Sequence, residues 1–205
     1  MPEVKSATGP AKPRTAGERL IVALDVQTRD EALGLVDRLG PETLWYKVGM
    51  ELFYAEGPAL LHELAARGKR TFLDLKLHDI PNTMAMALRS LSRLPFDLLT
   101  VHVPAGEEAL RACAAEAARC SETGRPAPVG LLGVTRLTSL PPPDPAEPWG
   151  DVVPLAGRAV AAGLFGWIAP AAAAPFLRAA HGTGPALVCP GIRLPDQGKQ
   201  DQVAV

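Results

Sequence analysis

The 205-residue chain is 47% hydrophobic and 21% charged and carries a formal net charge of −1, a composition typical of one soluble globular domain with a sizeable core. This near balance of charges provides no basic field for nucleic acid or an anionic membrane surface, and no apolar run approaches the roughly 18 residues that span a bilayer. Three cysteines without CxxC spacing argue against a disulfide framework or a structural zinc site. We therefore expect a cytoplasmic protein with no nucleic-acid or membrane partner.

The first 18 residues mix Pro, Ala, Thr and Gly with a few basic residues and lack the apolar segment of a secretory signal. Terminal segments that no packing holds in place are usually poorly ordered. We expect residues 1–18 to form a mobile tail and residues 19–205 to form a single domain.

Strands and helices are predicted to alternate through that domain. Continuous apolar runs predict buried strands at 19–25, 43–48, 70–75, 97–103, 129–135, 164–169 and 186–189. Apolar residues at helical spacing predict helices at 30–39, 58–67, 84–94, 107–119, 153–162 and 171–181. The alternation favours an α/β fold with a parallel sheet. A (β/α)8 TIM-type barrel is the most economical closure, here without a readable eighth strand and last helix.

One apolar stretch, residues 71–83, carries three formal charges, which hydrophobic cores rarely accept. Side chains alternate along a strand, so Asp74 and Lys76 share one face with Phe72 below them, while leucines pack behind. Asp79 lies just past the strand end. The charges therefore stand at the carboxyl end of a strand, where parallel α/β folds build their sites.

Lys47, near the end of the preceding strand, extends these charges to a row of alternating sign. We expect Lys76, between carboxylates, to be an ammonium and hence an acid, which counts against a Schiff-base aldolase. The same ammonium weakens a Mg²⁺ site at Asp74 and Asp79, although paired acids at a strand end do bind that ion. Such a row suits a reaction that builds negative charge on a substrate carbon. An ion-pair network without chemistry is the alternative, which the desolvation of charges at apolar strand ends disfavours.

Other polar positions follow later strands or the central motif. Residues 81–83 are predicted to form a turn into the helix at 84–94, and the Pro-rich segment 140–151 to form a loop. Thr138 and Ser139 are either turn formers or hydroxyls aimed at a polar ring. Arg193, which follows Pro-Gly-Ile, is a candidate phosphate ligand because a guanidinium matches a phosphoryl group bidentately. His78 and His102 are expected to be structural.

Together these motifs resemble the orotidine 5′-phosphate decarboxylase family, from about Leu20 to Gln202. The most specific part is the run DLKLHDIPNT at 74–83. It is supported by ALD at 23–25, KVG at 47–49, VT and LTS at 134–139, and PGIR followed by DQ between 190 and 202. The resemblance implies metal-free decarboxylation of orotidine 5′-phosphate to uridine 5′-phosphate in de novo pyrimidine synthesis, without a cofactor.

The resemblance also implies roles for individual residues. Lys76 would donate a proton to C6 of the ring, with Lys47 and Asp74 completing the charged row. The other implied roles are Asp25 and Lys47 at the ribose, Thr138 and Ser139 at the pyrimidine, Arg193 and Gln202 at the phosphate, and Asp79 and Thr83 reaching into the partner's site across a homodimer.

Three features depart from the family pattern, one of which is Ile168-Ala169-Pro170 in place of a Val-Cys-Ser-like strand end. The family continues past the DQ motif to an eighth strand ending in Gly-Arg, and Arg136 stands where the family more usually has an apolar residue. Two alternatives therefore stay open. One is a sugar-phosphate decarboxylase or lyase of the same barrel group, which could require Mg²⁺; the other is a non-catalytic remnant that folds or dimerises but binds nucleotide poorly.

Overall fold

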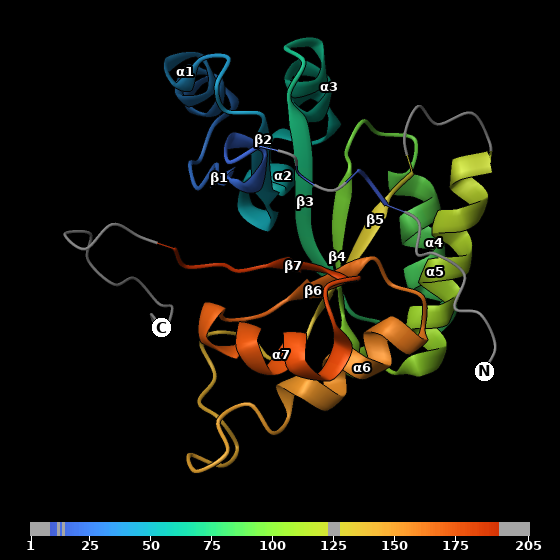
Figure 1. Ribbon diagram of the computed structural model, residues 1–205. Helices are drawn as coiled ribbons and strands as arrows, with labels where there is room; N and C mark the ends of the chain where they lie inside the picture. The colour runs from blue at the N-terminus through green and yellow to red at the C-terminus, as the bar shows by residue number, and fades with distance from the viewer. Residues whose placement is uncertain (1–8, 12, 14, 123–127, 193–205) are drawn as a thin grey trace.

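A curled, fully parallel sheet forms the centre of the computed structural model, which describes residues 9–11, 13, 15–122 and 128–192 (Figure 1). The sheet contains seven strands whose spatial order, β1 to β7, follows the chain without a jump. A doubly wound sheet reverses its strand order part-way, whereas a barrel does not. The uninterrupted order therefore confirms the predicted TIM-type arrangement, and the described residues contain no eighth strand.

The predicted alternation of strands and helices is confirmed. The strands are β1 (Ile21–Ala23), β2 (Trp45–Gly49), β3 (Arg70–Leu77), β4 (Leu98–His102), β5 (Gly130–Val134), β6 (Gly166–Ile168) and β7 (Ala186–Val188). The α-helices are α1 (Arg29–Leu39), α2 (Met50–Glu56), α3 (Pro58–Ala66), α4 (Pro81–Leu91), α5 (Glu107–Glu122), α6 (Val152–Ala161) and α7 (Ala174–His181). Short 3-10 helices occur at Gly17–Arg19, Val103–Ala105 and Ala171–Ala173. None of the helices in the described ranges is long and apolar enough to cross a bilayer.

Two helical segments differ from the sequence prediction. The turn predicted at 81–83 is wrong, because α4 already begins at Pro81, and Met84 donates the first helical hydrogen bond to the Ile80 carbonyl at 3.1 Å. Proline suits a first helical position, where its missing N–H would have no partner. Helix α2 was not predicted, since its seven residues bury only Leu52 and so give little periodic signal.

The two faces of the sheet bury different sets of apolar side chains. Trp45, Phe72, Leu98 and Leu132, one from each of β2 to β5, form a cluster on the inner face. Leu73 and Leu75 belong to the larger cluster between the sheet and the helices. The predicted placement of Phe72 opposite the leucines of its strand is therefore confirmed.

Arg70 and Asp97 form an ion pair at the amino ends of the strands. Arg70 Nη2 donates to Asp97 Oδ1 at 2.6 Å, and Asp97 Oδ2 accepts from the Thr71 amide at 2.9 Å. The Arg70 guanidinium also lies 4.3 Å from the centre of the Trp45 ring. These contacts hold the amino end of the sheet together.

Gly9, inside the expected tail, lies against the ring of Phe165. The assignment of residues 1–18 as a mobile tail stays a prediction.

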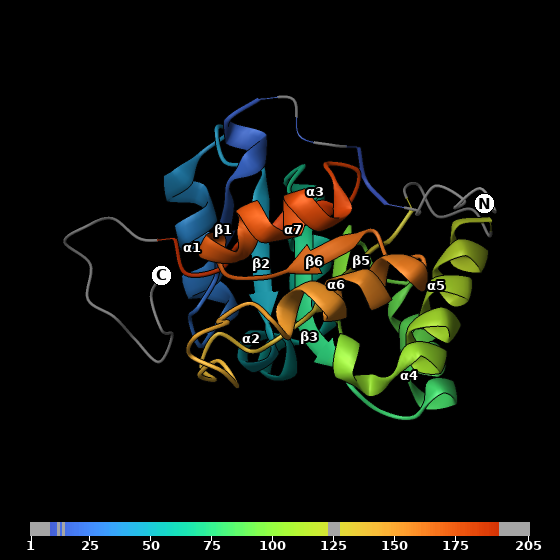
Figure 2. The same cartoon turned by 60° about the horizontal axis from the view of Figure 1, so that its bottom comes forward.

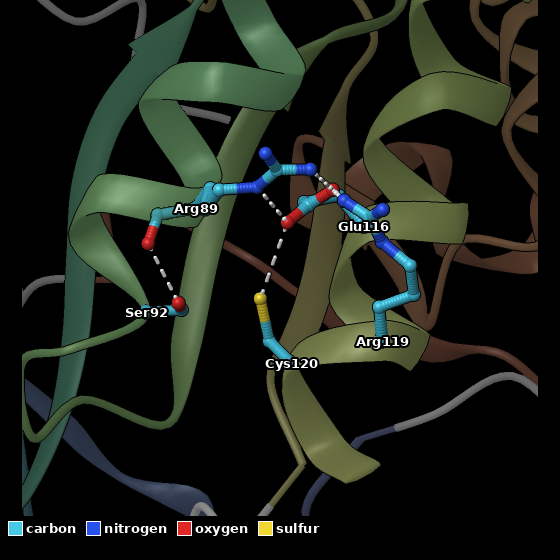
Figure 3. A network of polar contacts seen from close by, with 5 residues as sticks. All are labelled: Arg89, Ser92, Glu116, Arg119 and Cys120. Atoms are coloured by element: carbon cyan, nitrogen blue, oxygen red, sulfur yellow. Dashed lines mark hydrogen bonds and ion pairs between the residues drawn. The ribbon is translucent and has the colours of Figure 1, made fainter. Parts of the chain in front are cut away.

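Helices α4 and α5 lie side by side along the outside of the sheet (Figures 1 and 2). Figure 3 shows what joins them: Glu116 of α5, which is buried, accepts from Arg89 of α4 at 2.8 Å and also from Arg119. Cys120 donates to the same carboxylate at 3.6 Å. The hydrogen bond from Arg89, with that from Arg119, lowers the pKa of Glu116 to about 2. The network fixes α4, whose first turn lies at the opposite end of the helix from Arg89.

Replacing Glu116 with Gln removes the charge and nearly keeps the shape. At pH 7 we expect Tm to fall by roughly 2–4 °C. The pKa of Glu116 is lower in the folded chain than the ordinary 4.5, so its carboxylate stabilises the fold fully above about pH 4.5 and loses this effect as the pH falls toward 2. The Tm difference between wild type and Glu116→Gln should therefore shrink below pH 4.5 in calorimetry. Glu107→Gln on the exposed face of α5 is the control, and a difference that does not change with pH would refute the assignment.

Candidate active site

At the carboxyl end of the sheet, a polar layer lies on top of the inner apolar cluster. Two positions beyond Trp45, Phe72 and Leu98, the same inner face carries Lys47, Asp74 and Thr100. These strands pair in parallel, so the three side chains come from neighbouring strands at one end of the sheet. This is the end at which barrel enzymes carry their catalytic groups.

Asp74 lies at the centre of this layer and is only 9% exposed. Its Oδ2 lies 2.9 Å from the Lys76 ammonium, and its Oδ1 accepts from the hydroxyl of Thr100 at 2.9 Å. Both oxygens of the carboxylate are therefore engaged, one by a cation and one by a neutral donor. This arrangement presents a fixed, partly exposed ammonium beside a buried carboxylate.

An irregularity of β3 brings Lys76 into this position. Leu73 pairs with Leu99 and Leu77 with Val101, so four steps along β3 are matched by two along β4. Lys76 has a φ of 49°, the one positive φ among the described residues other than glycine. Bulges of this kind re-aim side chains and often lie beside active sites. Here the bulge leaves Asp74 and Lys76 close together, as their shared face in the sequence predicts.

A second ion pair joins β2 to the segment that follows β1. Lys47 Nζ is 3.1 Å from Asp25 Oδ1, and Asp25 is the more exposed partner. Gly49 is paired in register with Asp74, and a Cβ built on Gly49 would lie 3.4 Å from Lys47 Nζ. The two pairs are thus close together, one opening toward solvent and the other largely buried.

A capping box holds the loop that carries Asp25. Thr28 caps α1 by accepting from the Glu31 amide at 3.3 Å, while the Glu31 carboxylate accepts from the Thr28 amide at 3.1 Å. The same carboxylate also accepts from the Gln27 amide at 3.2 Å. The residues directly after Asp25 are therefore fixed by the start of the next helix.

Asp79 and Thr83 are exposed at the start of α4. Asp79 Oδ1 accepts from the Ile80 amide at 2.7 Å, and Thr83 lies in the first turn of the helix. Asp79 makes none of the ion pairs found among the described residues, so the structure does not add it to the row of Lys47, Asp74 and Lys76.

Thr138 and Ser139 lie in a turn just after β5, at the same end of the sheet. The Leu140 amide donates to the Leu137 carbonyl at 3.0 Å and closes the turn. Thr138 is half-buried and Ser139 is exposed. Arg193 and Gln202 lie outside the described residues, and their predicted phosphate contacts stay predictions.

Arg136 anchors the predicted loop 140–151, which the structure confirms as lacking helix and strand. Its Nη1 donates to Asp151 Oδ1 at 2.6 Å and its Nη2 to the Pro148 carbonyl at 2.9 Å. The guanidinium also lies 5.6 Å from the centre of the Trp149 ring, and the side chain is only 10% exposed. Sequence reasoning missed this role because the acidic partner lies 15 residues further on.

The two histidines near the site contact each other, with ring centres 5.2 Å apart. Burial, followed by the nearby His78 and Lys76, lowers the pKa of His102 below its usual value. His102 is therefore a neutral ring at pH 7, so it adds no second positive charge beside Lys76. In the part of the chain that the structure describes, no three His, Cys, Asp or Glu side chains are grouped to hold a metal ion.

This geometry can be set beside known proteins. A sequence model described as the Orotidine 5′-phosphate decarboxylase / HUMPS family matches residues 18–205. The chain belongs to this family. The match spans all seven strands and each residue of the polar layer, so the resemblance found in the motifs is confirmed across the domain.

Individual relatives match this chain over most of its length. Orotidine 5′-phosphate decarboxylase of Carboxydothermus hydrogenoformans is 41% identical over 195 residues, which cover 92% of this chain and 80% of that protein. The protein of the same name from Methylobacterium sp. (strain 4-46) is 44% identical over 200 residues, covering 95% and 82%. A crystal structure of orotidine 5′-phosphate decarboxylase from Lactobacillus acidophilus superimposes with a TM-score of 0.76 at 32% identity, covering 85% of this chain and 81% of that one. The sheet therefore belongs to the family's TIM-type barrel.

The Arg136 anchor generates a stability prediction. Arg136→Ala leaves Asp151 and the Pro148 carbonyl without their donor, so we expect the free energy of unfolding to fall by about 1.5–3 kcal/mol. Urea denaturation measures this loss. Arg111→Ala is the matched control, because Arg111 pairs with Glu107 on the exposed face of α5 and its loss should cost much less. Equal losses in the two variants would contradict the anchoring role.

Proposed function

We propose that this chain is a carboxy-lyase that converts orotidine 5′-phosphate to uridine 5′-phosphate in de novo pyrimidine synthesis, in the cytoplasm. One observation carries the proposal: the buried Asp74 holds the Lys76 ammonium at 2.9 Å within the motif that resembles this family most specifically. The names of the relatives supply the substrate.

Lys76 is the proposed proton donor. In decarboxylation the bond from C6 to the carboxyl carbon breaks, CO₂ leaves, and the electron pair stays on C6. An ammonium fixed beside that carbon stabilises the developing charge and then transfers its proton to C6, which leaves a lysine amine that solvent reprotonates. No electrons are gained or lost overall, so the chemistry asks for no redox partner. Asp74 orients the ammonium, and Lys47 completes the charged row beside it.

The remaining roles concern binding. Asp25 and Lys47 are proposed to contact the ribose, since a carboxylate accepts from and an ammonium donates to sugar hydroxyls. Thr138 and Ser139 are proposed to contact the pyrimidine edge. Arg193 and Gln202 are proposed for the phosphate on the strength of the sequence motif. Binding of this remote phosphate would then help to place the ring against Lys76.

A homodimer is part of the proposal, with Asp79 and Thr83 reaching the partner's site. Both residues are exposed at the start of α4. Two large apolar side chains close to them in the chain are also exposed: Ile80, the residue before α4, and Met86 within it. Grouped apolar exposure of this kind is typical of protein interfaces.

Turnover of orotidine 5′-phosphate in a buffer that contains a chelator tests the activity. We expect wild-type activity, and a loss of at least about 1,000-fold in kcat for Lys76→Ala, because both charge stabilisation and proton transfer disappear. Lys69→Ala is the control. Lys69 directly precedes β3 and donates to the Gly40 and Thr43 carbonyls, which lie before β2 and far from the polar layer. Activity that needs Mg²⁺ would favour a sugar-phosphate enzyme of the same barrel group. A folded chain that neither turns over substrate nor binds uridine 5′-phosphate in calorimetry would favour a non-catalytic remnant.

Mixing two inactive variants tests the shared site. In a dimer of one Lys76→Ala chain and one Asp79→Ala chain, one site has an intact Lys76 from its own chain and an intact Asp79 from the other. Random reassociation should therefore restore about a quarter of wild-type activity, because about half of the dimers are mixed and each has one intact site. Mixing Lys76→Ala with Asp74→Ala is the control and should restore much less, because both residues belong to one chain's site. No recovery in the first mixture would refute the contribution of Asp79 across the interface.

A further inference from the structure

Thr100 of β4 is completely buried and bonds both proposed catalytic residues of β3, through the Asp74 carboxylate and the Lys76 backbone amide. We infer that Thr100 is a positioning residue, whose hydroxyl holds the Asp74 carboxylate and the Lys76 backbone in the geometry of the ion pair. This inference rests on the proposed function for its catalytic consequence, while the contacts themselves belong to the fold.

The directions of the two hydrogen bonds follow from the chemistry of the groups. The Lys76 amide can only donate, so the Thr100 oxygen accepts from it at 2.8 Å. The hydroxyl hydrogen is then left for Asp74 Oδ1, at 2.9 Å. A hydroxyl is required at this position, because the same atom must accept one bond and donate another.

The bond to the Lys76 amide stabilises an unusual backbone. Lys76 lies in the left-handed region at φ 49°, which costs a residue with a Cβ of order 1 kcal/mol or more and persists only where other contacts hold it. The bulge also removes this amide from the regular pairing of β3 with β4. The Thr100 hydroxyl takes the place of the missing carbonyl acceptor and so keeps the bulge in shape.

The bond to Asp74 fixes the plane of the carboxylate. Lys76 alone would leave the carboxylate free to rotate, because the ammonium meets one oxygen only. Thr100 holds the other oxygen from the neighbouring strand. A misplacement of about 1 Å can cost about 100-fold in rate. If the carboxylate loosens, the ammonium moves with it, so kcat should fall while substrate affinity is retained.

Thr71 provides a matched control. It is a buried threonine on β3, at the amino end of the strand, and its hydroxyl has no hydrogen-bond partner among the described residues. Thr71→Val therefore makes the same chemical change as Thr100→Val without breaking a hydrogen bond. Thr100→Ser keeps the hydroxyl and is the conservative variant.

The experiment compares kcat, KM and the hydrogen exchange of the Lys76 amide in these three variants and in wild type. For Thr100→Val we expect kcat to fall roughly 10- to 100-fold with KM within about threefold of wild type. The Lys76 amide should exchange roughly tenfold faster or more, since its acceptor is gone. Thr71→Val should match wild type, and Thr100→Ser should recover most of kcat.

The outcomes separate this inference from the proposed function. Inactive wild-type protein would refute the proposed function alone. In that case, faster exchange of the Lys76 amide in Thr100→Val but not in Thr71→Val still supports the positioning contact. Unchanged exchange overturns the inference, whether or not wild type is active. With active wild type, a Thr100→Val kcat equal to that of Thr71→Val, or a rise in KM alone, overturns it as well. If Thr100→Val causes no further loss of kcat in a chain that already carries Asp74→Asn, Thr100 acts through Asp74; a full additional loss would overturn that route.

Discussion

The candidate site depends on one interaction, the ion pair between Asp74 and Lys76 at the end of β3. An isolated carboxylate in this position would be costly, because it lies on an apolar layer and is almost fully covered. Its two donors, the Lys76 ammonium and the Thr100 hydroxyl, offset that cost. The same burial weakens competition from water, so the ammonium keeps a defined direction. The stability of the fold and the proposed chemistry therefore both require the Asp74 carboxylate to keep its two donors.

The layer below explains why the charges are confined to one end of the sheet. Trp45, Phe72, Leu98 and Leu132 fill the inner face and leave no polar partner there. At the amino end, Arg70 and Asp97 satisfy each other. Two positions further along the strands, the inner face carries Lys47, Asp74 and Thr100, and the ammonium of Lys47 is partly exposed there. The alternation of the strands thus determines both where the core ends and where the site begins.

Sequence reasoning recovers the features that repeat along the chain and misses those that depend on distant partners. Apolar runs located all seven strands, and the period of two placed Asp74 and Lys76 on one face. The helix start at Pro81 was missed because a proline is equally at home in a turn. Thr100 was missed because threonine is an ordinary residue in a strand, although its position two residues beyond Leu98, on the inner face, was a usable signal. The bulge at Lys76 leaves no trace in the composition of β3.

The site divides into one part on the strands of the sheet and another part on the turn and loop after β5. Asp74 and Thr100 lie on paired strands, and Lys76 lies in a bulge, where its amide donates to the Thr100 hydroxyl. Thr138 and Ser139 lie in a turn, and the loop that follows is anchored by Arg136 through Asp151. Changes in the strand-borne groups must alter the geometry of the ion pair, whereas under the proposed function changes in the loop would alter how the substrate is held. Arg136 belongs to the second part, since its side chain bonds Asp151 and the Pro148 carbonyl rather than the ion pair. The sheet therefore holds the proposed reacting groups, and a loop after β5 carries the proposed pyrimidine contacts, as is common for binding residues on a rigid scaffold.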